Sequence, residues 1–341
     1  MPKPLTLAVL GATGAVGRAI VQVLGEQDLP IASLRLLARK DSAGEEVGFR
    51  GDSLEVEEAS PRAFRGVDLA FLAVPAAVAH EWAPRARAEG CRAVVDASPA
   101  FRSDPDVPLV VANVNPRALE AFGERGIAAG PEAAALLLAT ALEPLRQAAG
   151  LARVAAVTLH AASGSGEPAV RELESEVADL MNGRDPDPPI ESPHRVAFNL
   201  VPHLGGFGPE GRTDEEERTA AEVRRVLGEP DLHLSVASVR APVFYAHTQL
   251  VWLRTRRRLP VQEAREALRK GPGLKLLDDL KERVYPMPML AVNDDAVLVG
   301  RVREDVSEEN GLELVVSGDN LKAGAASNLV AVARRILEQA P

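Results

Sequence analysis

Short apolar runs alternate with amphipathic segments through the first 130 residues of the chain. The apolar run at 5–10 meets a glycine-rich turn, and apolar residues then recur at helical spacing at Val16, Ile20, Val21 and Leu24. Further runs predict strands at 34–38, 67–74, 92–96 and 109–111, with a helix at 76–89. Nearly continuous apolar strands with helices between them are typical of a parallel sheet covered on both faces. We therefore predict an α/β fold with a Rossmann-type doubly wound parallel sheet.

The pattern changes at about residue 152, where the predicted strands become longer and have alternating or antiparallel character. These strands are expected at 153–160, 231–239, 243–254, 296–303 and 311–318, with helices at 166–182, 214–227 and 261–269. The segment from Asn320 opens a last helix toward the C-terminus. A chain of 341 residues is also longer than one compact core usually holds. The second half therefore predicts a separate α+β domain with a largely antiparallel or mixed sheet.

Two helix starts can be predicted residue by residue. Thr213 and Glu216 have the spacing of a capping box, in which the glutamate folds back on the N-cap, and this leaves Glu215 freer for other contacts. In GIAAGPEAAALLL, Gly130 is suited to the N-cap and Pro131 to the first helical position. The alanines and leucines that follow propagate a helix. This second helix start follows a predicted strand directly, and it contains no nucleophilic side chain.

The composition is that of an ordinary globular protein and excludes several classes of function. A net charge of −10 disfavours a nucleic-acid surface, which needs clustered lysine and arginine. The longest apolar runs fall short of the roughly 20 residues of a membrane span, and the N-terminus lacks a signal-peptide pattern, so we expect a cytoplasmic protein. One cysteine, Cys91, and six scattered histidines predict neither an internal disulfide nor a metal site.

The letters GATGAVG follow the first predicted strand and open the first predicted helix. Glycine lets the backbone turn tightly and approach a pyrophosphate, whose charge is met by the N–H groups and the positive dipole end of the helix. A purely structural tight turn is the alternative, but a strand before and a helix after favour dinucleotide binding. The candidate cofactor-binding residues of the turn are Gly11, Thr13, Gly14, Ala15 and Val16.

The end of the second predicted strand carries charges of both signs. Arg39 and Lys40 suit the 2′-phosphate of NADP, whereas Asp41 beside them suits the ribose of NAD. Ser42 is a further candidate contact in the same turn. Either NADP or NAD therefore remains possible as cofactor, and an exposed polar turn without a ligand is the structural alternative.

Later motifs are more specific than the glycine turn. They are DASPAFR at 96–102, SGSG at 163–166, AFNLVPHLGGF at 197–207, VRAPVFYAH at 239–247, VGRVRED at 299–305 and VSGDNLKAGAASN at 316–328. Together with GATGAVG they run essentially from end to end, and the chain resembles the aspartate-semialdehyde dehydrogenase family. In that family a cysteine thiolate attacks an aspartyl phosphate, and NADPH reduces the resulting thioester to the semialdehyde.

The resemblance implies a division of labour along the chain. It implies an NAD(P)-binding Rossmann domain at 1–130, and a substrate and dimerisation domain at 131–318 like that of glyceraldehyde-3-phosphate dehydrogenase. A C-terminal helix at 319–341 is expected to return to the Rossmann domain. The implied partners are a second copy of the chain, in a homodimer, and a small amino-acid-like ligand, with no nucleic acid and no membrane.

Several residues stand where the resemblance places functional groups. His247 matches the acid/base histidine, Arg240 the arginine for the substrate carboxylate, and Arg102 the arginine for the phosphate. Glu215 matches the glutamate that receives the substrate ammonium, and Arg218 takes the position of a phosphate-binding lysine. Further cofactor contacts are implied at Ser163, Gly164, Asn320 and Gly324.

Other positions depart from the family pattern. Ala133 takes the place of the catalytic cysteine, and His160 takes the place of a glutamine. Ala97 and Pro99 replace an asparagine and a serine of the phosphate-binding motif. This combination is similar to the divergent Usg-type paralogues, which keep the fold while the active site drifts. It implies an NAD(P)-binding, dimeric homologue that lacks the phosphorylating aldehyde dehydrogenase activity.

Two alternatives stay open at this point. The first is an oxidoreductase that transfers hydride directly to a small amino-acid-like carbonyl or imine, with His247 or His160 as the proton donor. The second is that Cys91, or a cysteine of a partner, supplies the missing thiol. The strand position of Cys91, with no histidine or basic neighbour in sequence, favours a buried thiol without a catalytic role.

Overall fold

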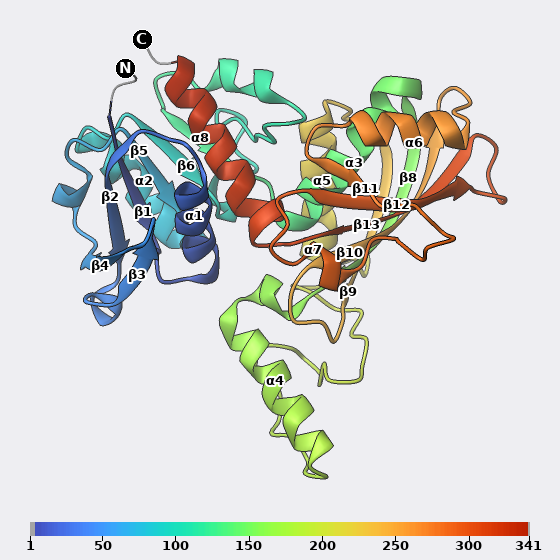
Figure 1. Ribbon diagram of the computed structural model, residues 1–341, viewed down its shortest axis with the longest axis horizontal. Coiled ribbons are helices and arrows are strands. Elements are labelled where there is room, and N and C mark those ends of the chain that lie inside the picture. The colour runs from blue at the N-terminus through green and yellow to red at the C-terminus, as the bar shows by residue number, and fades with distance from the viewer. Residues whose placement is uncertain (1–3, 340–341) are drawn as a thin grey trace. The chain divides into compact units, whose positions relative to one another are not determined.

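The computed structural model describes residues 4–339, and the chain forms two compact units (Figure 1). The first unit comprises the described residues up to Glu132 and those from Ala325 onward, and the second is Ala133–Gly324. The outermost positions of the predicted domains, 1–3 and 340–341, lie outside the described residues.

The first unit is built on a seven-stranded sheet in the order β3-β4-β2-β1-β5-β6-β7. Its strands are β1 (Leu5–Leu10), β2 (Ile31–Ala38), β3 (Glu46–Phe49), β4 (Asp52–Glu58), β5 (Leu69–Leu72), β6 (Ala93–Asp96) and β7 (Ile127–Ala129). Every neighbouring pair is parallel except the β3–β4 hairpin. The predicted doubly wound parallel sheet is confirmed.

Three helices pack on this sheet: α1 (Ala15–Glu26), α2 (Ala76–Ala88) and α8 (Ser327–Gln339). Although α8 is far away in sequence, Leu329, Val330 and Ile336 on it belong to the same buried apolar cluster as Ile20 and Leu24 on α1. Short 3-10 turns connect the elements: η1 (Lys40–Ser42), η2 (Pro61–Phe64), η3 (Pro99–Phe101) and η4 (Pro116–Ala121). The C-terminal helix therefore completes the core of the first unit.

The second unit contains a six-stranded mixed sheet in the order β11-β12-β13-β10-β8-β9. Its strands are β8 (Leu151–His160), β9 (His233–Arg240), β10 (His247–Thr255), β11 (Leu274–Leu276), β12 (Val297–Glu304) and β13 (Gly311–Gly318). The central strand β10 is antiparallel to both neighbours, whereas β8–β9 and β11–β12 are parallel pairs. The carboxyl ends of β8 and β9 therefore meet the amino end of β10 at one edge of the sheet.

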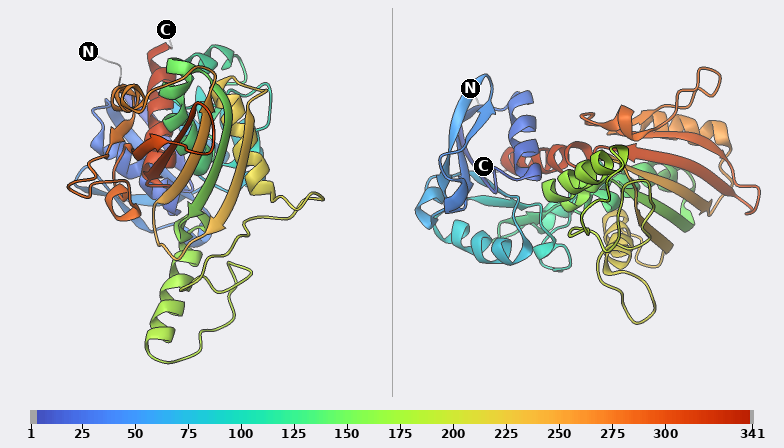
Figure 2. Two further views of the ribbon diagram at one scale, coloured as in Figure 1. Left: turned by 90° about the vertical axis from the view of Figure 1, so that its right-hand side faces the viewer. Right: turned by 90° about the horizontal axis from the view of Figure 1, so that it is seen from below.

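Helix α3 (Ala133–Ala149) lies against β10 and β13, and it also contacts α5 (Asp214–Leu227) and α6 (Val261–Lys270). The remaining elements are α4 (Glu167–Met181), α7 (Pro288–Ala291), the 3-10 turn η5 (Ala162–Ser165) and the π-helical turn η6 (Lys322–Ala326). Figures 1 and 2 show α4 and the loop after it extending away from the sheet of this unit. The predicted second domain with a mixed sheet is confirmed.

The capping box is confirmed, whereas two predicted elements are wrong. Thr213 and Glu216 exchange the two hydrogen bonds of a capping box at the start of α5. The predicted strand at 109–111 is reduced to a single bridge between Leu109 and Ala129. Helix α3 begins at Ala133 and not at Pro131, because the N–H of Gly130 still donates to the carbonyl of Asp96 in the sheet.

Candidate functional site

The glycine turn of the first unit connects β1 to α1, and close packing explains two of its glycines. Gly11 has a φ of +87°, and a Cβ there would lie 2.2 Å from the carbonyl oxygen of Ala73. A Cβ on Gly17 would lie 2.0 Å from the carbonyl oxygen of Gly11. Gly14 is different, since it is exposed at the N-cap of α1 and no side chain caps that helix. The first N–H groups of α1 can therefore receive an anion.

The residues predicted to contact the adenosine lie at the same edge of the sheet. Because β1 and β2 are parallel neighbours, the turn η1 after β2 lies beside the glycine turn, and the N–H of Gly11 donates to the carbonyl of Leu37 over 2.8 Å. Arg39 and Lys40 are exposed, and Ser42 is half-buried. The candidate adenosine contacts therefore lie in the turn beside the glycine turn, at the carboxyl end of the neighbouring strand.

Arg102 ties together two backbone segments of the first unit. Its Nε donates to the carbonyl of Gly130 over 3.0 Å, and an Nη donates to the carbonyl of Ala97 over 2.7 Å. These contacts connect the chain after β6 to the chain after β7. The sequence motif predicted a phosphate contact for Arg102 and gave no indication of this structural role.

In the second unit, His247 is the first residue of β10, and its side chain is almost completely buried. Its Nδ1 accepts a hydrogen bond from the N–H of Ala161 over 3.1 Å. Burial, and then the positive charge of Arg240, lower the pKa of His247 to about 3. The imidazole is therefore neutral near pH 7, with its proton on Nε2.

Arg240 ends β9 and lies beside His247, with 8% of its surface exposed. One Nη donates to the carbonyl of Ala161 over 2.6 Å, and the other donates to the hydroxyl of Ser165. Burial lowers the pKa of the guanidinium, and the charge of Glu215 opposes this shift. A buried guanidinium of this kind favours a carboxylate ligand.

His160 ends β8 and packs against the same imidazole. The ring centroids of His160 and His247 are 4.8 Å apart, and Nε2 of His160 lies 3.2 Å from the hydroxyl of Ser238. Burial, followed by the influences of His247 and Arg240, lowers the pKa of His160 well below its usual value. His160, the predicted replacement of the family glutamine, is thus a second neutral, buried imidazole.

Glu215 and Arg218 lie on the first turns of α5 and bind each other. An Nη of Arg218 donates to a carboxylate oxygen of Glu215 over 2.7 Å, and the other Nη donates to Asp214 over 3.0 Å. Glu215 is outside the capping box that occupies Glu216, but it has a local partner of its own in Arg218. The carboxylate of Glu215 nevertheless acts electrostatically on Arg240.

Asn320 holds the loop that precedes β10. Its Oδ1 accepts hydrogen bonds from the hydroxyl of Ser163 over 2.9 Å and from the N–H of Ala246 over 3.1 Å. Ala246 has a φ of +69°, a conformation that is costly for a residue with a Cβ. Nδ2 of Asn320 donates no hydrogen bond to another described residue, so this amide group is available to a ligand.

Ala133 is the first residue of α3 and is partly exposed, whereas the residues after it are buried. A Cβ on Gly324 would lie 2.9 Å from the Cβ of Ala133, so the two residues pack closely. The next carbonyl, of Ala134, accepts a hydrogen bond over 2.9 Å from Gln249, two residues along β10 from His247. The predicted position of the family cysteine thus lies at a helix N-terminus that contacts β10, the strand that begins at His247.

Sequence reasoning missed four residues that support this site. They are Ala161, Ser165, Ser238 and Ala246. Ser165 lay within the motif SGSG, and Ala246 lay within the motif VRAPVFYAH. Ala161 and Ala246 act through backbone groups and Ser238 acts through a hydroxyl on a neighbouring strand, so no residue type marks these three roles.

Cys91 does not have the properties of a nucleophile. Its side chain is completely buried, and its thiol donates to the carbonyl of Ala93 over 3.1 Å. Burial raises its pKa to about 11, so almost no thiolate forms near pH 7. The alternative in which Cys91 itself replaces the missing cysteine is therefore not supported.

Two kinds of feature are absent from residues 4–339. Within this range, no group of three or more histidine, cysteine, aspartate or glutamate side chains could hold a metal ion. No helix in the same range is long and apolar enough to cross a membrane.

Comparison with known proteins assigns a family to both units. The model described as "Semialdehyde dehydrogenase, NAD binding domain" matches residues 6–122, and "Semialdehyde dehydrogenase, dimerisation domain" matches residues 142–323. An aspartate-semialdehyde dehydrogenase of Synechocystis sp. is 37% identical over 99% of each chain. The crystal structure of aspartate semialdehyde dehydrogenase II of Vibrio cholerae complexed with ASA is 32% identical and matches with a TM-score of 0.94 over 99% of each chain.

A more distant structure, the aspartate semialdehyde dehydrogenase of Candida albicans with NADP, shares the fold. It is 22% identical, with a TM-score of 0.74 over 98% of each chain. The identity to the Synechocystis relative extends over nearly the whole length of both chains, and both domain models match. The chain therefore belongs to the aspartate-semialdehyde dehydrogenase family, with an NAD-binding domain and a dimerisation domain.

Proposed function

We propose that this family member binds NAD(P) and dimerises but does not catalyse the phosphorylating aldehyde dehydrogenase reaction, as a divergent paralogue of the Usg type. The observation that carries the proposal is the methyl group of Ala133 at the start of α3. A thiolate at a helix N-terminus is a ready nucleophile for acyl transfer, and alanine cannot form the thioester. Cys91 offers no substitute because it is buried and protonated.

The proposed cofactor is NADP or NAD. The exposed, uncapped start of α1 fits the pyrophosphate, and Arg39, Lys40 and Ser42 fit the adenosine end. Ser163, Gly164, Asn320 and Gly324 are proposed as contacts for the other half of the dinucleotide. When bound in reduced form, the cofactor supplies a hydride. In this division of work, residues 1–130 and the returning helix hold the nucleotide, and residues 131–318 hold the substrate and the partner subunit.

The retained polar residues support binding of a small amino-acid-like ligand. Arg240 is a buried cation for a carboxylate, and the nearby negative charge of Glu215 suits an ammonium group. Arg218 and Arg102 are the proposed phosphate contacts. Arg218 also donates to Glu215, and Arg102 also donates to the carbonyl of Gly130, so each would share its donors with the phosphate. The ligand site is thus maintained without the covalent nucleophile.

Restoring the cysteine tests the missing chemistry. The wild-type protein should bind NADPH or NADH in a fluorescence titration and show no phosphate-dependent oxidation of aspartate semialdehyde. Ala133→Cys should create this activity if the rest of the site is intact, whereas Ala134→Cys, one residue further and buried, should not. Oxidation by the wild type at a rate near that of cysteine enzymes would overturn the proposal.

A different conclusion follows if Ala133→Cys binds the cofactor normally but shows no oxidation of aspartate semialdehyde. This result would identify Ala97, Pro99 and His160 as further lesions. His160→Gln combined with Ala133→Cys would then be the next variant, because it restores the family side chain beside His247. Failure of both cofactors to bind the wild type would contradict the cofactor half of the proposal.

A homodimer is proposed because the second unit matches a dimerisation domain and carries large exposed apolar side chains. These are, among others, Phe198, Leu200, Phe207, Phe244 and Tyr245. Leu200→Asp should weaken the dimer in analytical ultracentrifugation, whereas Val306→Asp, at an apolar position that is even more exposed, should not. A wild-type protein that stays monomeric at tens of micromolar would contradict this assignment.

A second candidate function is a reductase that works without a covalent intermediate. His247 favours it, because its Nδ1 accepts the N–H of Ala161 and its Nε2–H is then a hydrogen-bond donor for the substrate oxygen. Hydride added to the carbonyl carbon of an amino-acid-like substrate gives an alkoxide, which this hydrogen bond stabilises and which takes a proton from water to yield an alcohol. Oxidation of NAD(P)H by such carbonyls, lost in His247→Gln, would support this function. If the carbonyls have no effect on thermal stability or turnover, it is excluded.

A further inference from the structure

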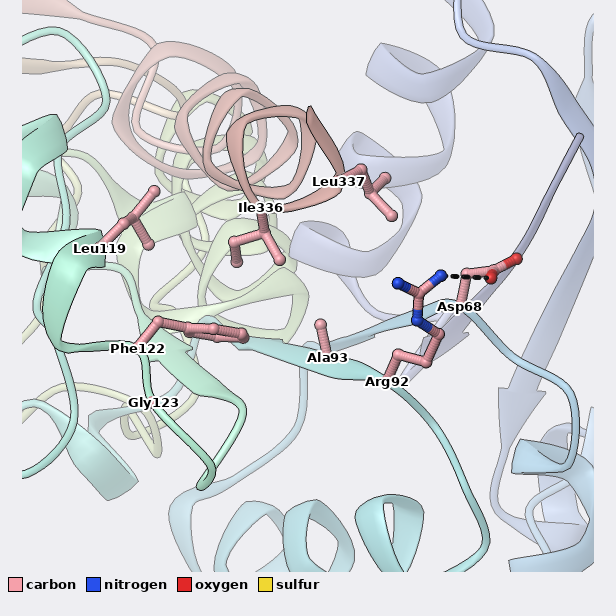
Figure 3. A pocket seen from close by; sticks show the side chains of 8 residues that line it. All are labelled: Asp68, Arg92, Ala93, Leu119, Phe122, Gly123, Ile336 and Leu337. Atoms are coloured by element: carbon pink, nitrogen blue, oxygen red, sulfur yellow. Dashed lines mark ion pairs between the residues drawn. The ribbon is translucent and has the colours of Figure 1, made fainter. Parts of the chain in front are cut away.

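A pocket of about 250 Å³ lies in the first unit, at the edge of the sheet opposite the glycine turn (Figure 3). Asp68 precedes β5, and Arg92 precedes β6, so both lie at the amino ends of their strands. The glycine turn, in contrast, follows the carboxyl end of the parallel strand β1. The pocket is therefore separate from the proposed dinucleotide site, and all its lining residues belong to one unit.

Most of the pocket wall is apolar. Leu119 from η4 and Phe122 after it form one side, and Ile336 and Leu337 on α8 form another. Ala93 at the start of β6 lies across the pocket from Ile336 (Figure 3). An apolar wall of this kind binds the hydrocarbon part of a ligand.

The remaining wall carries the anchored carboxylate of Asp68 and the guanidinium of Arg92, which has few hydrogen-bond partners. Asp68 is 8% exposed, and its Oδ2 accepts the N–H of Thr6 over 2.9 Å, which anchors it to the sheet. An Nη of Arg92 lies 3.5 Å from Oδ1 of Asp68, and 47% of the Arg92 side chain is exposed. Arg92 donates no hydrogen bond to any other described residue, so its fork of donors faces the pocket with one loose ion pair.

We propose that this pocket binds a small monocarboxylate with an apolar body. The carboxylate would receive paired N–H donors from Arg92, and Asp68 would hold the guanidinium in place. The apolar body would lie between Phe122 and Ile336. The volume is below the range of about 300–1,000 Å³ typical of drug-sized ligands, which limits the body to a short aliphatic or single-ring group.

The test compares a matched acid and amide, 4-methylpentanoate and 4-methylpentanamide, by calorimetry and by thermal shift on the full chain. The acid should bind at least about tenfold more tightly, because the amide loses the charge-assisted hydrogen bonds. Arg92→Gln should remove this preference. Arg85→Gln, which breaks a surface ion pair with Glu81 elsewhere on the unit, should not.

Three results would overturn the proposal. The first is an absence of acid binding at millimolar concentration, and the second is equal binding of acid and amide. The third is binding that survives Arg92→Gln and disappears in Arg240→Gln, since the carboxylate would then occupy the site of the second unit. Chemical-shift mapping locates the ligand directly: perturbation of Gly123 and Leu337 supports the pocket, and perturbation confined to other residues contradicts it.

Discussion

The N–H of Ala161 donates a hydrogen bond to Nδ1 of His247 over 3.1 Å. A ring nitrogen that accepts a hydrogen bond carries no proton, so the neutral imidazole is protonated on Nε2. The carbonyl of the same residue accepts from Arg240 over 2.6 Å. One backbone residue therefore orients both the acid/base candidate and the carboxylate-binding candidate, and its role does not depend on its side chain.

The burial of His247 should make the protein less stable in acid. Its pKa is about 3 in the folded chain and about 6.5 in the unfolded chain, so below pH 6.5 only the unfolded chain gains this proton. The stability contributed by the neutral ring is lost as pH falls through this window, and at pH 5 the loss is about 2 kcal/mol. Urea unfolding of wild type and His247→Gln at pH 7.5 and 5 measures the difference.

An exposed histidine provides the control for this pH dependence. His194→Gln should leave the acid slope unchanged, because the side chain at this position is exposed in the folded protein. NMR of the imidazole nitrogens adds a direct readout, with Nδ1 of His247 unprotonated from pH 8 to 5. Titration of His247 near pH 6.5 would contradict the assignment of a buried neutral ring.

Gly164→Ala should displace His247. A Cβ at this position would lie 2.9 Å from Cε1 and 3.1 Å from Nε2 of the imidazole. Overpacking of this kind costs about 1–3 kcal/mol, and the ring cannot move away without losing its bond to Ala161. The measurement is the free energy of unfolding together with the imidazole resonances of His247.

The matched control for this substitution is Gly206→Ala. No atom outside the neighbouring residues lies within 4 Å of a Cβ built on Gly206, so this alanine should be tolerated. Equal stability of the two variants, with unchanged resonances of His247, would show that the loop at 161–165 does not press on the ring.

Helices and strands could be predicted from the sequence where buried residues recur at a regular spacing within a short segment. Contacts between residues far apart in the sequence could not be predicted in this way. Strands β8 and β10 follow the alternation of their own residues, which a short window detects. The bond from Ala161 to His247 spans 86 residues and uses a backbone donor, so no residue type marks it. The pairing of Arg218 with Glu215 was within reach, since a spacing of three on a helix brings charges together.

The helix start at Ala133 illustrates a second limit. Gly130 and Pro131 have the local chemistry of an N-cap and a first helical residue, yet neither residue belongs to the helix, which begins at Ala133. The carbonyl of Gly130 is held by Arg102, and its N–H is held by Asp96. Tertiary hydrogen bonds thus outweigh the local propensity, and they delay the helix until Ala133, the predicted position of the family cysteine.

Asn320→Ala should destabilise the loop before β10. It removes the shared acceptor of Ser163 and Ala246, leaves the buried N–H of Ala246 unpaired, and releases a backbone held at a φ of +69°. The expected cost is about 1–3 kcal/mol. In a double-mutant cycle, Ser163→Ala should reduce the additional cost of Asn320→Ala, because the two side chains share one hydrogen bond.

The control for this cycle is Asn182→Ala, which truncates an exposed asparagine at the end of α4. Its effect should stay within about 0.5 kcal/mol. Strict additivity of Ser163→Ala and Asn320→Ala would mean that their hydrogen bond contributes nothing to stability.

Asp96→Asn should stabilise the protein at neutral pH. Asp96 is completely buried, Oδ1 has no hydrogen-bond partner among the described residues, and Ser98 donates to Oδ2 over 2.8 Å. Burial raises the pKa to about 6 from 3.8, against the opposing effects of Ser98 and Arg102. Because the unfolded chain ionises first, stability falls as pH rises from 3.8 to about 6, by up to about 3 kcal/mol.

Urea unfolding of Asp96→Asn tests this pH dependence. Asparagine is uncharged, so the free energy of unfolding of the variant should exceed that of wild type at pH 7.5 and lose this advantage at pH 4. The exposed control Asp106→Asn should change neither value. A variant less stable than wild type at pH 7.5 would show that the folded protein depends on the ionised carboxylate.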